Sequence, residues 1–348
     1  MREVQYQAMQ YRNDRNILSY YSFSGGIFDT ENSDRLADNE VSDMINLDIV
    51  NDGSLKMRDN FIVSDLSPTT VDTTKSYSDV AVFDAGTSYE MIGILDNNIV
   101  KIPSNEVMVS DFGSSMNTVQ YGNRLYVLGN GKLMVYDGSK IEDIATYHAS
   151  DIENLTEEEK ERNDLSFVKD GKFITIAQGR LVISGITSEP NSVYFSEPYK
   201  PWFFDSLDLN DVVYPSQSDN DRVTALYDYS DGLMVFKRQS IYIISGVIGG
   251  SNTQMYRMNV PTGTMSPKTI KRIDKFLVFL GTDKKVYGIY GGSYYSMNKD
   301  RVNIYLLSGT IENLLNRIQD TDKEKIVATY YNGVYIMAFP LTGEDGVT

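Results

Sequence analysis

A chain of 348 residues with 41% hydrophobic residues is long enough for two ordinary domains or for one large β domain with a sizeable core. It has no cysteine and one histidine, His148, so disulfides, thiolate metal sites and multi-histidine zinc sites are excluded. A formal net charge of -16 argues against tight binding to phosphate backbones. No apolar run approaches the roughly 18 residues that a membrane-spanning helix needs.

The N-terminal part of the chain predicts an arm followed by a few short strands. Residues 1–17 are polar and mixed in charge, without the apolar stretch of a secretory signal, and predict an arm that needs a partner to become ordered. Strands are expected over Leu18–Phe23, Gly25–Phe28 and, after the Asn51-Asp52-Gly53 turn, Ser54–Arg58.

From Tyr77 onward one pattern recurs, in which a turn of Asn, Asp or Gly precedes a short alternating apolar strand. The clearest instance is Asp219–Gly246, where Val223–Tyr227, Gly232–Phe236 and Ser240–Ile244 predict three strands of an antiparallel meander. Further strands of this kind are expected over Ile99–Ile102, Leu125–Leu128, Leu133–Tyr136, Leu181–Ser184, Phe276–Leu280, Lys285–Ile289 and Val334–Phe339.

The spacing of the pattern predicts the architecture. Markers at positions 123, 179, 232, 275 and 332 lie 56, 53, 43 and 57 residues apart, and such a period with several strands per unit is typical of a β-propeller. We predict an all-β chain with one β-propeller domain of about six blades over residues 18–348; a β-sandwich is the alternative. The last unit is short, and the strands near 18–58 are candidates to complete it. The six units are Tyr77–Pro103, Val107–Thr146, Phe167–Phe204, Val223–Met258, Ser266–Met297 and Ile326–Phe339.

Two insertions are expected to be helical. Asp151–Asp164 has Thr156 as N-cap and Glu159 at the capping-box position, and its charged body predicts a solvent-exposed helix. Ser308–Gln319, with Thr310 near its start, is amphipathic, and we expect its apolar face to pack against the propeller, or else against a neighbouring subunit. That face consists of Ile311, Leu314, Leu315 and Ile318.

No pattern in the sequence predicts catalysis or a cofactor. Ser245–Gly250 lacks the Lys-Ser/Thr end of a phosphate loop, and no pair stands out among the 48 acidic residues for glycoside hydrolysis. The acidic turns Asp48–Gly53 and Asp219–Asp221 lack EF-hand spacing, so a calcium site there is the minor alternative to ordinary turns. His148 is expected at the surface. We therefore predict no enzyme, no cofactor and no metal.

The densest aromatic stretch is the candidate partner contact. It contains Tyr199, Trp202, Phe203 and Phe204, which either form an exposed patch for a partner or cover one end of a blade. Two small groups of basic residues are expected to be solvated turn charges; they are Lys237 and Arg238, and Lys268, Lys271 and Arg272.

Several phrases, taken in chain order, resemble the β-propeller structural proteins of short-tailed bacteriophages, namely tail nozzle, tail hub and tail-stabilisation proteins. The resemblance covers roughly residues 23–340 and rests on the order of the phrases; Arg58-Asp59-Asn60 departs from the expected Arg-x-Gly. The phrases are Phe23–Ile27, Asp38–Glu40 with Asn46–Asp48, Gly53–Arg58, Val193–Pro198 with Trp202–Asp205, Gly232–Lys237 with Ser240–Tyr242, Gly263–Ile270 and Val278–Asp283.

The resemblance implies a structural virion protein, made in the host cytoplasm and assembled into the tail. Such a subunit forms a six-fold ring with copies of itself, contacts neighbouring tail or connector proteins, and lines or caps the channel through which the genome is ejected. DNA would be met only in transit, without specific binding, and no membrane insertion is expected. The acidic composition agrees, because it offers few phosphate contacts.

Two other functions stay open at this point. The first is an adhesin of the tail tip that binds a host surface glycan or protein, which an exposed aromatic cluster around Trp202 would favour. The second is a glycan-degrading enzyme, which requires two carboxylates converging in a groove.

Overall fold

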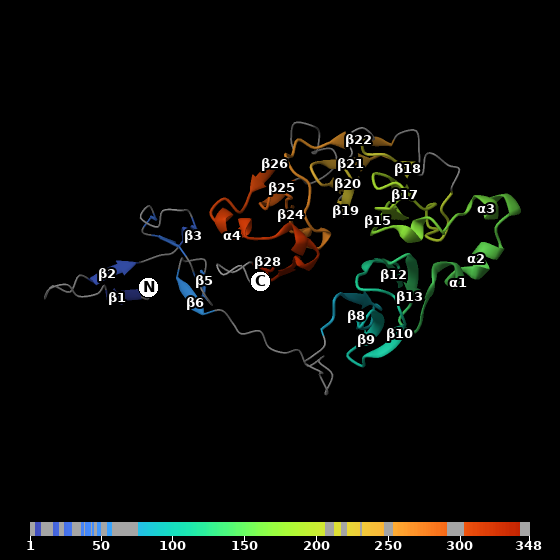
Figure 1. The fold of residues 1–348 in the computed structure, drawn as a ribbon, viewed down its shortest axis with the longest axis horizontal. Coiled ribbons are helices and arrows are strands. Elements are labelled where there is room, and N and C mark those ends of the chain that lie inside the picture. The colour runs from blue at the N-terminus through green and yellow to red at the C-terminus, as the bar shows by residue number, and fades with distance from the viewer. Residues whose placement is uncertain are drawn as a thin grey trace.

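The computed structural model describes residues 4–7, 17–20, 24–29, 36–37, 39–42, 44, 47–49, 54–57, 76–205, 212–216, 221–229, 232–246, 253–290 and 303–341. In these residues the strands form nine sheets and the helices are short (Figure 1). The prediction of a mostly β chain with short helical insertions is confirmed, and the sheets follow one another in a propeller-like series.

Five sheets are four-stranded antiparallel meanders, which we number sheets 1 to 5 in chain order. Sheet 1 has β7 (Val80–Asp84), β8 (Tyr89–Leu95), β9 (Asn98–Ile102) and β10 (Glu106–Val109). Sheet 2 has β11 (Asn117–Tyr121), β12 (Arg124–Gly129), β13 (Lys132–Tyr136) and β14 (Ile141–Asp143). Sheet 3 has β15 (Phe173–Ala177), β16 (Arg180–Ser184), β17 (Val193–Phe195) and β18 (Val212–Val213).

Sheets 4 and 5 are also four-stranded, and two strands of sheet 6 are described. Sheet 4 has β19 (Val223–Tyr229), β20 (Gly232–Lys237), β21 (Ile241–Ser245) and β22 (Gln254–Arg257). Sheet 5 has β23 (Lys271–Ile273), β24 (Phe276–Leu280), β25 (Val286–Tyr290) and β26 (Asn303–Leu306). Sheet 6 has two described strands, β27 (Val327–Tyr331) and β28 (Val334–Ala338).

Tight turns join the strands, and four of them hold two consecutive residues at positive φ. That backbone belongs to two-residue hairpin turns whose twist matches the flanking strands, and Asn, Asp and Gly adopt it at low cost. The turns predicted from the sequence at these places are therefore confirmed. The pairs are Asp96-Asn97, Asn130-Gly131, Gln178-Gly179 and Asn332-Gly333.

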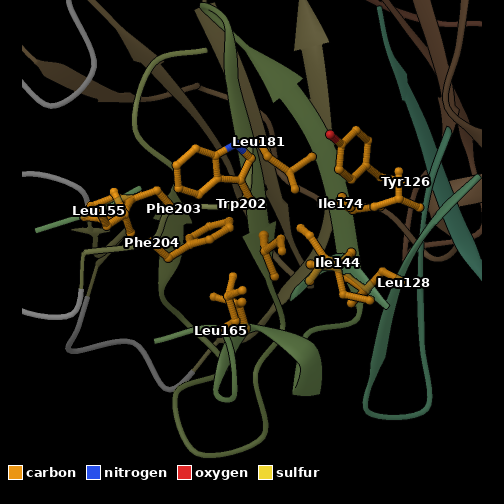
Figure 2. Close-up of a cluster of buried hydrophobic side chains, with 14 residues drawn as sticks. Tyr126, Leu128, Ile144, Leu155, Leu165, Ile174, Leu181, Trp202, Phe203 and Phe204 are labelled. Atoms are coloured by element: carbon orange, nitrogen blue, oxygen red, sulfur yellow. The ribbon is translucent and has the colours of Figure 1, made fainter. Parts of the chain in front are cut away.

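One hydrophobic cluster fills each junction between successive sheets. Ala81, Phe83 and Leu125 belong to the cluster between sheets 1 and 2, and Figure 2 shows the cluster between sheets 2 and 3. Further clusters lie between sheets 3 and 4, 4 and 5, and 5 and 6. Successive side chains of a strand point to opposite faces of its sheet. The strands thus supply apolar side chains to the junctions on both sides of the sheet, as in stacked sheets.

At four of the five junctions the first strands of neighbouring sheets contact each other. β11 contacts β7 and β15, β15 contacts β19, and β23 contacts β27. The sheets therefore succeed one another around an arc, with their later strands pointing outward (Figure 1). Across this arc, Lys268 of the 3-10 helix η4 (Pro267–Thr269), which precedes β23 of sheet 5, forms an ion pair with Asp79, which directly precedes β7 of sheet 1.

The predicted unit boundaries need correction. Val107, placed at the start of the second unit, lies in β10 and pairs with Val100 of sheet 1. The third unit extends past Phe204 to β18, because Val213 pairs with Val193. The fifth includes β26, which follows the expected boundary at 297. The periodicity of apolar residues predicts where a strand lies. Which strand an outer strand pairs with depends on the turn that joins the two, and the residues of the joining loops here do not predict that pairing.

Among the described residues, no N-terminal strand pairs with sheet 6. The N-terminal strands form three separate two-stranded sheets. The strands are β1 (Val4–Gln7) with β2 (Ile17–Tyr20), β3 (Gly26–Ile27) with the parallel β4 (Glu40–Val41), and β5 (Leu47–Ile49) with β6 (Leu55–Met57). The turn at 51–53 and the motif at 58–60 lie outside the described residues.

Both predicted helical insertions are helical over shorter ranges. The first comprises α2 (Ala149–Glu153) and α3 (Glu157–Arg162), preceded by α1 (Ile144–Tyr147). The predicted capping box of Thr156 and Glu159 is confirmed, and it begins α3 as a helix separate from α2. The second is α4 (Glu312–Asn316). Single 3-10 turns are η2 (Val168–Asp170), η4 (Pro267–Thr269) and η6 (Asp320–Lys325).

Candidate interaction surface

The predicted aromatic patch is mostly part of the core. Trp202, Phe203 and Phe204 are buried in the cluster between sheets 2 and 3 (Figure 2), so they are not available as an exposed patch for a partner. The alternative that these rings cover one end of a sheet is the one that the structure supports. Tyr199 differs, because its side chain is 80% exposed.

His148 is buried beside this patch, and its expected surface position is wrong. Its Nδ1 lies 2.8 Å from Asp151 Oδ2, its Nε2 lies 3.4 Å from the Tyr126 hydroxyl, and its ring centroid is 6.0 Å from that of Trp202. Burial lowers the pKa of His148 and outweighs the hydrogen bond to Asp151, which raises it. The residue joins α1 and α2 to the core and keeps its neutral form.

The acidic helix α3 is held against the same patch by its last residues. Arg162 forms an ion pair with the buried carboxylate of Asp205, and the amide of Phe204 donates a 3.1 Å hydrogen bond to Asn163 Oδ1. A helix with a fully polar surface therefore has a defined position, because its C-terminal residues satisfy buried polar groups next to Trp202.

Tyr199 is fixed in an uncommon conformation on the surface. Its φ is +60°, where bulky residues are rare, and its amide donates a 2.8 Å hydrogen bond to Gly179 O. A Cβ at Gly179 would lie 3.0 Å from the Tyr199 ring, so glycine allows the ring to lie over the turn. The Tyr121 hydroxyl donates to the same carbonyl at 3.0 Å. The result is an exposed ring on a rigid base.

The amphipathic helix packs inside its own chain. Leu315 and Ile318 are fully buried between sheets 5 and 6, while Ile311 and Leu314 are half-buried. Packing against the sheets, the favoured alternative, is confirmed. Ile311 is the N-cap, and no side chain of the helix caps it. Asp29 does so instead: Leu314 N donates a 2.6 Å hydrogen bond to Asp29 Oδ2.

Two of the basic residues are structural and not solvated charges. Lys237 is buried; its Nζ donates a 2.8 Å hydrogen bond to Pro215 O and lies 5.6 Å from the Tyr242 ring centroid. Burial also lowers the pKa of Lys271. Arg238 is exposed between β20 and β21, as expected for a turn charge, whereas Arg272 is exposed but lies in β23.

Within the described part of the chain no three acidic or histidine side chains gather as metal ligands; residues 50–53 and 219–220 of the two acidic turns lie outside it. Asp221 instead accepts hydrogen bonds from the amides of Arg238, at 2.9 Å, and Gln239, at 3.0 Å. Its carboxylate closes the turn between β20 and β21. No helix in the described residues is long and apolar enough to cross a membrane.

The surface that the sequence analysis missed lies at sheets 5 and 6. Residues 326–340 contain no charged residue, and the face of sheet 6 that carries Tyr331, Val334 and Ile336 is exposed. On sheet 5, Tyr305 and Leu307 are 46% and 51% exposed. We call the outer edge of β28, together with Tyr290, Tyr305 and Leu307, the open edge. The uncharged run and the two-strand unit were its signals in the sequence.

Comparisons with known proteins give only distant similarities. No protein-family profile and no curated protein matches the chain. Among solved structures it is similar to PorZ, a surface component of the type-IX secretion system of Porphyromonas gingivalis, at 12% identity over 67% of this chain and 27% of that one, with a TM-score of 0.38. It is also similar to the extracellular domain of the putative hybrid two-component system BT4673 of B. thetaiotaomicron. The identity is 12% over 73% of this chain and 30% of that one, with a TM-score of 0.44.

Hsv2p of Kluyveromyces lactis is 11% identical over 72% of this chain and 73% of that one, with a TM-score of 0.38. The chain thus spans about a quarter to a third of the first two proteins and most of the third. These identities and TM-scores define neither a family nor a function for the chain.

Proposed function

We propose that the chain is a structural, non-enzymatic subunit of a bacteriophage tail, a hub or nozzle subunit that works in a ring around the genome-ejection channel. The observation that carries the proposal is the exposed, uncharged surface at sheets 5 and 6. An exposed apolar surface beside a strand edge that is unpaired among the described residues is a protein interaction site or an aggregation hazard. The ordered resemblance to tail proteins gives the kind of assembly.

At the level of architecture, we propose that sheets 1 to 6 are the blades of a β-propeller. The order of strands within each sheet, the hydrophobic cluster at each junction and the adjacency of the first strands support it. A rigid series of blades suits a subunit that must keep the shape of a channel. The acidic composition would let DNA pass without sticking.

The test is the mass of the purified full-length protein, measured by light scattering on a sizing column at low and moderate salt, alone and with neighbouring tail proteins. A discrete ring, or a monomer that enters one with a tail partner, supports the proposal. A monomer at both salt concentrations that ignores tail proteins contradicts it.

One observation favours the alternative function, an adhesin for a host surface glycan. The exposed Tyr199 ring, held over Gly179, presents a flat face on which a sugar could stack. Because Trp202 is buried, its fluorescence is not expected to report sugar contact directly. Binding of cell-wall glycan that is lost in Tyr199→Ala and kept in Tyr89→Ala, a change at another exposed tyrosine, would establish the adhesin.

A further inference from the structure

The strand count leaves a defined vacancy beside sheet 6. Sheets 1 to 5 each have four strands, whereas β27 and β28 pair only with each other among the described residues. β27 lies against β23 at the inner side, so β28 presents its other edge outward. The positions of a third and a fourth strand are therefore beyond β28.

The facing part of sheet 5 is uncovered at the matching place. Val278 of β24 and Val286 of β25 are buried under sheet 6 and α4. On the same face, toward the other end of these strands, Tyr290 of β25 and Tyr305 of β26 pack around Phe276, with ring centroids 5.0 and 6.0 Å from it, yet remain exposed. Two more strands in sheet 6 would cover these rings.

The chain also carries a two-stranded hairpin with one apolar face. In β5–β6, the pairs Leu47–Met57 and Ile49–Leu55 lie on one face, and the pair Asp48–Lys56 lies on the other. Met57 is 75% exposed. A hairpin with two strands alone is marginally stable in water and gains stability when it extends a larger sheet.

We propose that the β5–β6 hairpin of a second copy docks on the open edge and supplies the third and fourth strands of sheet 6. Its apolar face would cover Tyr290, Tyr305 and Leu307, and Asp48 and Lys56 would stay on the opposite face. This inference rests on the proposed ring and names the joint between its subunits. Each copy gives one hairpin and receives one, a head-to-tail contact that forms a ring when the rotation between copies closes.

The placement of the hairpin favours a second copy over its own chain. In the single chain Met57 and the open edge are exposed, whereas Leu47, Ile49 and Leu55 are half-buried. Figure 1 shows β5 and β6 apart from β25 and β26, on the side where β28 lies. The N-terminal segment is fastened at its base, because Asp29 N donates to Thr310 O at 2.9 Å and Asp29 caps α4. The open edge is uncharged next to β28, which lowers the repulsion between copies of net charge -16.

The absence of cysteine from the chain makes a cross-linking test clean. The double variant Met57→Cys/Leu307→Cys of the full chain places one thiol on the hairpin and one on the open edge. It is oxidised under the conditions used for light scattering and separated on a non-reducing denaturing gel. The matched control is Met57→Cys/Tyr89→Cys, whose second position is more exposed (75% at Tyr89 against 51% at Leu307) but lies on sheet 1.

The expected result is a ladder of cross-linked multimers with a yield roughly tenfold above the control, since docking holds the two thiols at a high effective concentration. A fast-migrating monomer with an internal cross-link would overturn the proposal, because the hairpin would then serve its own chain. A yield equal to the control would also overturn it. If the cross-linking yield equals the control but light scattering shows a ring, the proposed hairpin contact is wrong and the proposed ring stands. A protein that stays monomeric even with tail partners contradicts both the hairpin contact and the ring.

Discussion

A hydrophobic cluster fills both the junction between sheets 2 and 3 and the junction between sheets 5 and 6, but the two junctions differ at their outer rims. At the first, four strands face four, and Trp202, Phe204 and Leu155 extend the core to the outer rim. At the second, four strands face two, and Tyr305 stays exposed on the outer half of its sheet. The alternation of a strand makes it apolar on one face, but the number of strands opposite decides whether that face is covered.

The largest effect should come from a truncation in the closed junction. Leu181 is fully buried between sheets 2 and 3, so Leu181→Ala removes packed methyl groups and leaves a cavity. We expect a loss of about 2–5 kcal/mol in the free energy of unfolding. Urea denaturation followed by the fluorescence of Trp202, the single tryptophan, measures it; a loss below that of an exposed Val334→Ala control would show that this junction is not packed as described.

A smaller loss should follow from breaking the ion pair at the rim of that junction. Arg162→Ala leaves the buried Asp205 carboxylate without its guanidinium partner, and we expect a loss of about 1–3 kcal/mol. Arg162→Lys keeps the charge without the planar fork and should lose less. Equal unfolding midpoints for the three proteins in urea would contradict the role given to this pair.

Acidification should weaken the closed junction through His148. Burial holds the pKa of folded His148 below its ordinary value of 6.5, so the unfolded chain binds a proton first as the pH falls. Stability is therefore complete above pH 6.5 and declines below it, until the folded pKa is reached. Stability measured against pH should lose this step in His148→Gln; an identical step in the variant would assign it to other groups.

The smallest effect on the folded monomer is expected at the open edge. Leu307 is 51% exposed, so Leu307→Ser should change the free energy of unfolding of the monomer by only about 0.5 kcal/mol. If the open edge is a joint, the same change weakens self-association, because it places a hydroxyl in the apolar contact between Leu307 and the hairpin. Light scattering over a dilution series compares the variant with the parent. Unchanged association would argue that this face is not part of the contact.

The strands were predictable because their signals are local. The Asn-Gly turn at 332–333 and the alternation of Val334–Ala338 are visible in the sequence, as is the capping box at Thr156. The start of α4 was not, since Asp29 caps it from far away in the chain. Long-range pairing leaves no periodic signal, and for that reason β10 was assigned to the wrong unit.

The candidate surfaces were harder to predict than the fold. Trp202, Phe203 and Phe204 were singled out by composition, yet composition does not tell a core cluster from an exposed patch. Lys237 and His148 were expected in water, and each is buried with polar partners. The open edge follows from counting strands in a folded arrangement, which no single stretch of sequence displays.

Hydrogen exchange of the backbone amides, compared between the dilute subunit and the assembled protein, tests the central claim most directly. The account predicts that the amides of β28 that point away from β27 exchange rapidly in the dilute subunit and slowly after assembly, because new strand pairing protects them. Amides of β12, in the closed junction, should be slow in both. Unchanged exchange in β28 upon assembly, with the mass of the ring confirmed in the same sample, would contradict the claim that sheet 6 is completed by a partner.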